Sequence, residues 1–80
     1  MNLPELVGPE GLAPGAIIID GHDDAILGIS GRRILIYERA AILKRLMKRD
    51  GMSRRGADEF IEYNIETGNN GFGFILVERI

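Results

Sequence analysis

Two segments with apolar residues at helical spacing, separated by a glycine, restrict the fold of this chain more than any other feature. The first covers residues 38–50, where four apolar positions share one face of a helix. These positions are Ile42, Leu43, Leu46 and Met47. Gly51 follows, and a glycine in the left-handed conformation is a common end of a helix.

The second helix is expected to run from a cap at Ser53 to about residue 67. Serine is a favoured N-cap because its hydroxyl oxygen accepts a hydrogen bond from a free backbone N–H. Gly56 stands where a glutamate would complete a capping box, so the helix is expected to begin weakly. Its apolar face consists of Ala57, Phe60, Ile61 and Ile65, and Asn64 falls in the middle of that face.

Three short apolar runs predict strands. Residues 25–30 and 33–37 lie on either side of a turn at Gly31, a pattern typical of a β-hairpin. Residues 72–77 predict a last strand after a turn rich in glycine and asparagine. The predicted fold class is α+β: a small antiparallel sheet with two helices packed on one face, in the order β-β-α-α-β.

Residues 1–16 differ in composition from the rest and contain all three prolines of the chain. Proline removes a backbone donor and glycine loses much conformational entropy on folding, so regular structure is not expected there. We interpret 1–16 as an irregular arm, which either folds back on the core, covers a neighbouring subunit or is partly disordered. Residues 17–80 are predicted to form a single α+β domain.

The chain has 80 residues, no cysteine and a formal net charge of −2. So short a chain buries a small core and has no disulfide to support it, which favours self-association. The charge balance gives no long-range attraction to nucleic acid or anionic lipid. A basic leader and an apolar run of about 20 residues are both missing, so a cytoplasmic protein is expected.

The sequence Asp-Gly-His-Asp-Asp at residues 20–24, here called the acidic turn, concentrates three acids and the only histidine. If it were extended, Asp20, His22 and Asp24 would share one face and could approach a metal ion. Ligands of a structural site normally come from separate elements, however. The favoured interpretation is a structural turn whose carboxylates accept backbone N–H groups, with Asp20 or Asp23 as a cap. A contact surface for a partner and a metal site are the alternatives.

No catalytic constellation is visible in the sequence. Nucleophilic catalysis needs a base beside a positioned hydroxyl or thiol. The chain has one histidine and no cysteine, and its two serines, Ser30 and Ser53, fall in the predicted hairpin and at a helix cap. The sequence therefore predicts neither an enzyme nor a cofactor.

The densest group of cations lies on the outer face of the first predicted helix and just beyond it. It consists of Lys44, Arg45, Lys48, Arg49, Arg54 and Arg55. Such a group is either a solvated face paired with nearby acids or a surface for an acidic partner or a phosphate group.

Asn64 has two interpretations as well. A buried amide needs partners for both its oxygen and its nitrogen. Asn64 therefore either ties the loop after its helix to the sheet or joins Tyr63, Tyr37 and His22 in a polar pocket for a ligand.

Three pieces of the chain occur together in a fixed order. They are Asp-Gly-His-Asp-Asp-Ala-Ile-Leu-Gly-Ile at 20–29, Ile-Tyr-Glu-Arg at 36–39, and Asp-Gly-Met-Ser at 50–53 leading to Glu-Tyr-Asn at 62–64. Over about residues 18–66 this pattern resembles a group of small proteins of tailed bacteriophages, typically of unknown function. The resemblance implies a phage accessory protein in the cytoplasm of the infected host.

A small chain without a catalytic constellation acts most simply by binding. We expect non-catalytic binding that inhibits a host or defence-system component, in the manner of an anti-CRISPR protein. The alternative is an oligomeric binder that sequesters an anionic nucleotide signal. A host or defence protein is the expected partner and a homo-oligomer is possible, whereas nucleic acid and membrane are not expected. The candidate binding residues are Asp20, His22, Asp23, Asp24, Tyr37, Lys44, Arg45, Lys48 and Asn64.

Overall fold

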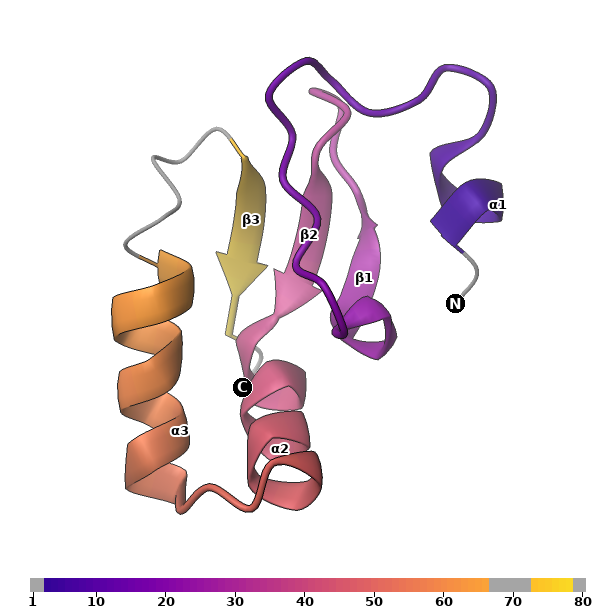
Figure 1. Cartoon of the computed structure of the whole chain (residues 1–80). Coiled ribbons are helices and arrows are strands. Elements are labelled where there is room, and N and C mark those ends of the chain that lie inside the picture. Colours follow the sequence, from indigo (N-terminus) through magenta and orange to yellow (C-terminus); the bar gives the residue numbers. More distant parts are fainter. Residues whose placement is uncertain (1–2, 67–72, 79–80) are drawn as a thin grey trace.

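The centre of the fold is strand β2 (Leu35–Glu38), which pairs with β1 (Ile26–Ile29) on one side and with β3 (Phe74–Val77) on the other. The computed structural model describes residues 3–66 and 73–78. Helices α2 (Arg39–Arg49) and α3 (Arg54–Phe60) connect β2 to β3 (Figure 1). The predicted α+β class and the order β-β-α-α-β are confirmed.

The sheet is mixed, which corrects the prediction of an antiparallel sheet. β1 runs antiparallel to β2, with Ile26 opposite Tyr37, as expected for a hairpin. β3 instead runs parallel to β2, with Phe74 opposite Leu35. The reason is the path of the two helices: α2 leads away from the end of β2, and α3 leads back along the sheet (Figure 1). β3 therefore starts at the same end of the sheet as β2.

One face of the sheet and the apolar faces of both helices form the core. Leu35 and Tyr37 are fully buried, while Ile36 and Glu38 are half-buried, an alternation that fits a strand covered on one face. The ring of Tyr37 packs edge-on against Phe74, with ring centroids 5.9 Å apart. The buried helical residues of this core are Ile42, Leu46, Ala57, Ile61 and Ile65.

The predicted end of the first helix at Gly51 and the predicted cap of the second at Ser53 are confirmed, while the predicted end of the second helix at about residue 67 and the turn after it lie outside the described residues. Gly51 follows α2 with a φ of 68°, in the left-handed region that glycine adopts readily. The N–H of Gly56 donates to the Ser53 hydroxyl oxygen over 3.0 Å, so Ser53 caps α3. The two helices thus form a hairpin with a short, well-defined connection.

Asn64 does not lie in the apolar face of its helix, contrary to the prediction. α3 continues into a π-helix, η2 (Ile61–Glu66), whose turns are wider than those of an α-helix. In that geometry Ile65 follows Ile61 on the buried face, and Asn64 is turned outwards and exposed. The assumption of α-helical spacing placed Asn64 on the wrong side.

The N-terminal arm is not irregular throughout, because it holds the short helix α1 (Leu3–Val7) beside β1 (Figure 1). Pro4 is tolerated there since the first turn of a helix needs no backbone donor. Arg33 fixes the arm to the hairpin: its Nε donates to the Gly11 carbonyl over 3.0 Å, and its Nη2 donates to the Val7 carbonyl.

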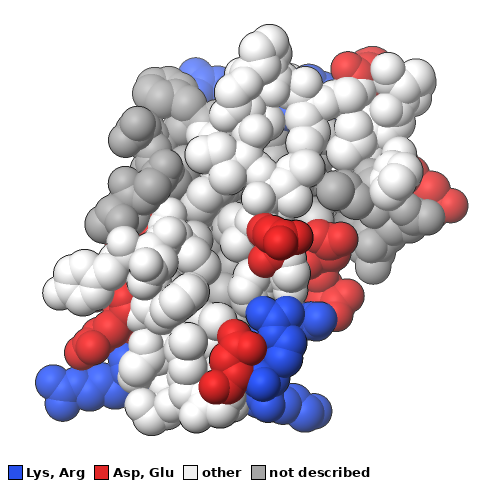
Figure 2. Space-filling view, in the orientation of Figure 1, with Lys and Arg blue, Asp and Glu red and all other residues white. Residues whose placement is uncertain are grey.

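The segment 16–19 crosses the sheet in front of β2 (Figure 1). The N–H of Ile17 donates to the Gly73 carbonyl over 2.8 Å, and the N–H of Ile19 donates to the Tyr37 hydroxyl over 2.9 Å. Figure 2 shows few charged side chains at the centre of this face, while blue and red groups meet towards its lower part.

Candidate functional site

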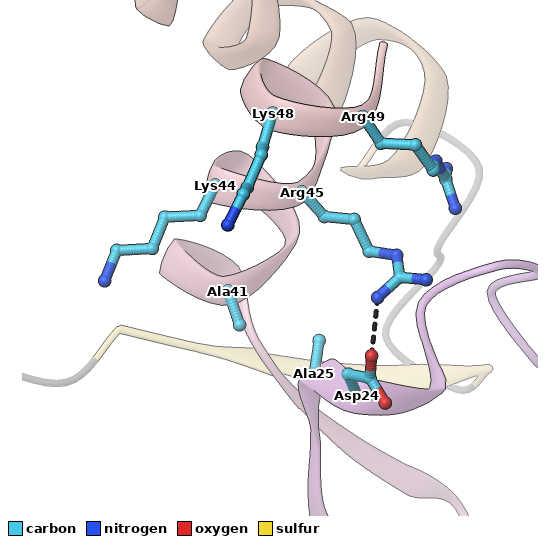
Figure 3. Close-up of a pocket in the computed structure, with 7 residues that line it drawn as sticks. All are labelled: Asp24, Ala25, Ala41, Lys44, Arg45, Lys48 and Arg49. Carbon is cyan, nitrogen blue, oxygen red and sulfur yellow. Dashed lines mark hydrogen bonds and ion pairs between the residues drawn. The ribbon is translucent and has the colours of Figure 1, made fainter.

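A groove of about 400 Å³ lies between α2 and the acidic turn, and we call it the basic groove (Figure 3). Two small side chains, Ala25 and Ala41, face each other at its centre. The charged residues that line it are Asp24, Lys44, Arg45, Lys48 and Arg49. Four cations and one carboxylate give this lining a net charge of +3.

Local structure brings these residues together. Positions 41, 44, 45 and 48 of α2 are three, four and seven residues apart, so their side chains emerge on one side of the helix. Ala41 leaves room between the cations because it ends at Cβ. On the opposite wall, a single 3₁₀ turn, η1 (Asp23–Ala25), carries Asp24 towards α2. The predicted cap by Asp20 or Asp23 is wrong, because η1 begins after His22 and no side-chain hydrogen bond caps it.

Arg45 and Asp24 form the contact that spans the basic groove (Figure 3). Arg45 Nη1 donates to Asp24 Oδ2 over 2.5 Å, and the two side chains are 38% and 72% exposed. Exposed ion pairs of this kind contribute about 0–1 kcal/mol to stability. Arg45 Nε, by contrast, is buried and has no hydrogen-bond partner among the described residues. Arg45 is thus only partly satisfied by Asp24.

Arg49 is held by the backbone of the acidic turn. Its Nη1 donates to the Gly21 carbonyl over 3.1 Å. Gly21 has a φ of 81°, and a Cβ there would lie 3.2 Å from Arg49 Nη1. Both the left-handed backbone and the close approach of the guanidinium therefore favour glycine at this position.

His22, in the acidic turn, is buried, with 4% of its surface exposed. Burial lowers the pKa of His22, and the nearby cations of Arg49 and Arg45 lower it further, against the smaller opposing effects of Asp50 and Asp20. Its Nδ1 has no hydrogen-bond partner in the described part of the chain. His22 is therefore an uncharged packing residue of the turn at neutral pH.

Lys44 and Lys48 differ from the two arginines. Both lysines are exposed, and neither forms an ion pair with any residue of 3–66 or 73–78. They supply positive charge at the mouth of the groove that no described carboxylate neutralises.

The remaining candidate residues lie elsewhere. Asp20 and Asp23 are exposed and do not line the groove. Tyr37 is fully buried in the core, where its hydroxyl accepts the Ile19 N–H. Asn64 lines a separate cavity of about 190 Å³ next to Ile17. The polar pocket predicted from Asn64, Tyr63, Tyr37 and His22 does not form, because Tyr37 and His22 are buried and do not open onto a shared pocket.

Sequence reasoning left Ala25, Ala41 and Arg49 out of the candidate set. Arg49 belonged to the predicted basic group, and the folded chain places it in the lining of the groove, where it also donates to the Gly21 carbonyl. Ala41 carried a readable signal, since a small residue one turn before Arg45 opens space within a cationic helix face. Ala25 carried none, because its position depends on the packing of η1 against α2.

The arrangement is suited to holding an anion. In the described ranges, no three histidine, aspartate or glutamate side chains are placed to hold a metal ion. No helix in the same ranges has the length and apolar character needed to cross a lipid bilayer.

Comparison of the chain with protein-family models, with curated proteins and with solved structures found no match.

Proposed function

We propose that this chain is a non-catalytic binding module whose basic groove takes an acidic segment of a partner protein. The observation that carries this proposal is the uncompensated charge of Lys44 and Lys48 beside the neutral floor of Ala25 and Ala41. Carboxylates of a partner would supply the missing counter-charges, and the alanine floor leaves room for them to approach.

Energetics support a role in recognition for the two lysines. Like charges four residues apart on a helix destabilise it by about 0.2–0.5 kcal/mol. A helix face that keeps such a pair without acids to balance it gains from an external anion. Positive potential over a groove also speeds the encounter with an acidic partner and disfavours basic ones.

For the biological setting, we propose that the partner is a host or defence-system protein and that binding inhibits it in the cytoplasm of a phage-infected cell. The support is the sequence resemblance of residues 18–66 to small proteins of tailed bacteriophages. A binding module that needs no catalytic group fits such a role, because blocking a surface requires complementarity alone.

Affinity purification with charge-reversed variants tests the function. The variant Lys44→Glu/Lys48→Glu should bind its partner with about thirtyfold lower affinity, since two exposed charge contacts contribute about 1 kcal/mol each. The matched control is Arg54→Glu/Arg55→Glu, which changes the net charge equally at exposed positions of α3 outside the groove. A partner retained equally by both variants would contradict the proposal.

An anionic nucleotide is the second candidate ligand, because a groove of about 400 Å³ with four cations is of a size to hold one. A panel of mono-, di- and cyclic nucleotides should then raise the melting temperature of the wild-type chain, and Lys48→Gln should weaken the response. A melting temperature that stays constant across the panel would exclude this ligand class.

A further inference from the structure

The geometry points to an exchange at Arg45: when an acidic segment of a partner protein enters the basic groove, one of its carboxylates replaces Asp24 on the Arg45 guanidinium. This inference rests on the proposed function and adds the form of the ligand. Asp24 then acts as an internal ligand that occupies the anchoring position until a partner arrives.

Asp24 is placed to be replaced rather than to lock the structure. Its carboxylate is 72% exposed, and among the described residues its only hydrogen bond is the 2.5 Å one from Arg45 Nη1. It comes from η1, on the wall opposite α2, so releasing it breaks no hydrogen bond within either helix (Figure 3). The exposed pair is screened by water and is weak.

The Arg45 guanidinium gains from the exchange. In its present position it uses Nη1 towards Asp24, while Nε–H is buried without a partner. A carboxylate that approaches the edge formed by Nε and Nη2 accepts two parallel hydrogen bonds. Asp24 holds the guanidinium from the other side, at Nη1, so this edge faces the groove only when the guanidinium turns away from Asp24. The guanidinium needs only to turn towards the groove, and its side chain is already 38% exposed. The exchange therefore satisfies a donor that Asp24 leaves unpaired.

The two lysines indicate the form of the incoming segment. Lys44 and Lys48 are four residues apart in α2, a rise of about 6 Å along the helix. Alternate residues of an extended chain are about 6.6–6.8 Å apart and point to the same side. An extended segment with acids at alternate positions therefore matches both lysines, with a further carboxylate free to reach Arg45. Adjacent acids would point to opposite sides and match fewer cations.

Fluorescence anisotropy with two labelled synthetic peptides tests the exchange on the full chain. One peptide, Glu-Ser-Glu-Ser-Glu, has alternate acids, and the other, Ser-Glu-Glu-Glu-Ser, has the same composition with adjacent acids. The alternate peptide should bind about threefold or more tightly than the adjacent one. Asp24→Asn should raise its affinity about twofold to fivefold by removing the internal competitor.

Asp23→Asn is the matched control, because it removes the same charge from the same turn at a position outside the groove. It should change the affinity by less than half as much as Asp24→Asn. Equal effects of the two variants would overturn the exchange and leave a general charge effect in its place. The Arg45 Nε–H resonance gives a direct readout, since it should shift on addition of the alternate peptide if the exchange occurs and stay in place if it does not.

Two further arms separate this inference from the proposed function. Lys44→Glu/Lys48→Glu should abolish peptide binding, and binding that persists there would overturn the function itself. Inorganic tripolyphosphate that displaces the peptide at equal charge concentration would show that the site prefers phosphate, which would overturn the carboxylate class. Circular dichroism melting confirms that each variant is folded, and Asp24→Gln provides a second neutral substitution if Asp24→Asn is not.

Discussion

The cations of helix α2 differ in how they are paired with carboxylates. At its first residue, Arg39 Nη1 contacts Asp58 at 2.6 Å, and its Nε lies 3.1 Å from Glu66 and 3.9 Å from Glu78. The Arg39 side chain is 18% exposed, and the hydrogen bond to Asp58, supported by that to Glu66, raises the pKa of Arg39. Further along the same helix, Lys44 and Lys48 form no ion pair with a carboxylate of the described residues. Surplus acid around Arg39 indicates a structural tie, whereas surplus cation around the groove is the observation on which the proposed binding surface rests.

The largest effect should come from breaking the structural tie. Arg39→Met should lower the free energy of unfolding by about 1.5–3 kcal/mol, because charged hydrogen bonds are lost and the nearby carboxylates then repel one another. Lys48→Met, with the same change of charge and shape, should alter it by less than about 0.5 kcal/mol. Urea denaturation of both variants measures the difference, and similar losses would remove the distinction between the two regions.

Acidification should lower the free energy of unfolding through His22 in the acidic turn. His22 has a lowered pKa in the folded chain, so the unfolded chain binds its proton first as the pH falls. The stability contribution of neutral His22 is complete above the unfolded pKa of about 6.5 and declines as the pH falls towards the lower folded pKa, by less than about 1.4 kcal/mol per pH unit. Denaturation between pH 7.5 and 5.5 should show this decline.

His22 is the only histidine, so replacing it isolates the effect. His22→Gln should remove most of the pH dependence between pH 7.5 and 5.5, whatever its effect on overall stability. A decline of the same slope in that variant would assign the pH dependence to other groups.

The smallest expected effect is a gain in stability. Lys44→Glu places an acid four residues before Lys48 and should stabilise α2 by about 0.3–0.5 kcal/mol, since this orientation of a helical ion pair is the favourable one. The same variant should bind acidic peptides more weakly. Thermal denaturation at low salt measures the gain, and a loss of stability instead would mean that Lys44 has a structural role.

Patterns within single elements were readable from the sequence. The Ser53 cap and the Gly51 end depend on spacing and local hydrogen bonds, and both are confirmed. Of the predicted stripe, Ile42 and Leu46 are buried and Leu43 packs against the core, whereas Met47 is exposed. The order of the elements followed from them. The sequence did not reveal the direction of β3, because the direction depends on where the helical hairpin returns the chain rather than on any residue of the strand.

The site was predicted in parts and assembled by tertiary structure. Asp24 and the cations of α2 were each singled out, but their contact joins residues 21 positions apart. No local pattern sets that pairing. Asn64 was misplaced for a different reason, since the π-helix that turns it outwards departs from the spacing that the prediction assumed. The turn residue Arg33 was not singled out either, although its φ of 65° and its contacts with the arm make it a joint between two segments.

The junction between β2 and α2 has a consequence for how this chain tolerates change. Glu38 is the last residue of the strand and also the N-cap of the helix, and Arg39 begins the helix without any connecting loop. The rotational phase of α2 is therefore coupled to the pleat of β2. Inserting one residue at this junction would rotate every later side chain by about 100° around the helix axis. Lys44, Arg45 and Lys48 would then leave the acidic turn together, so the surface can vary by substitution but not by a change of length here.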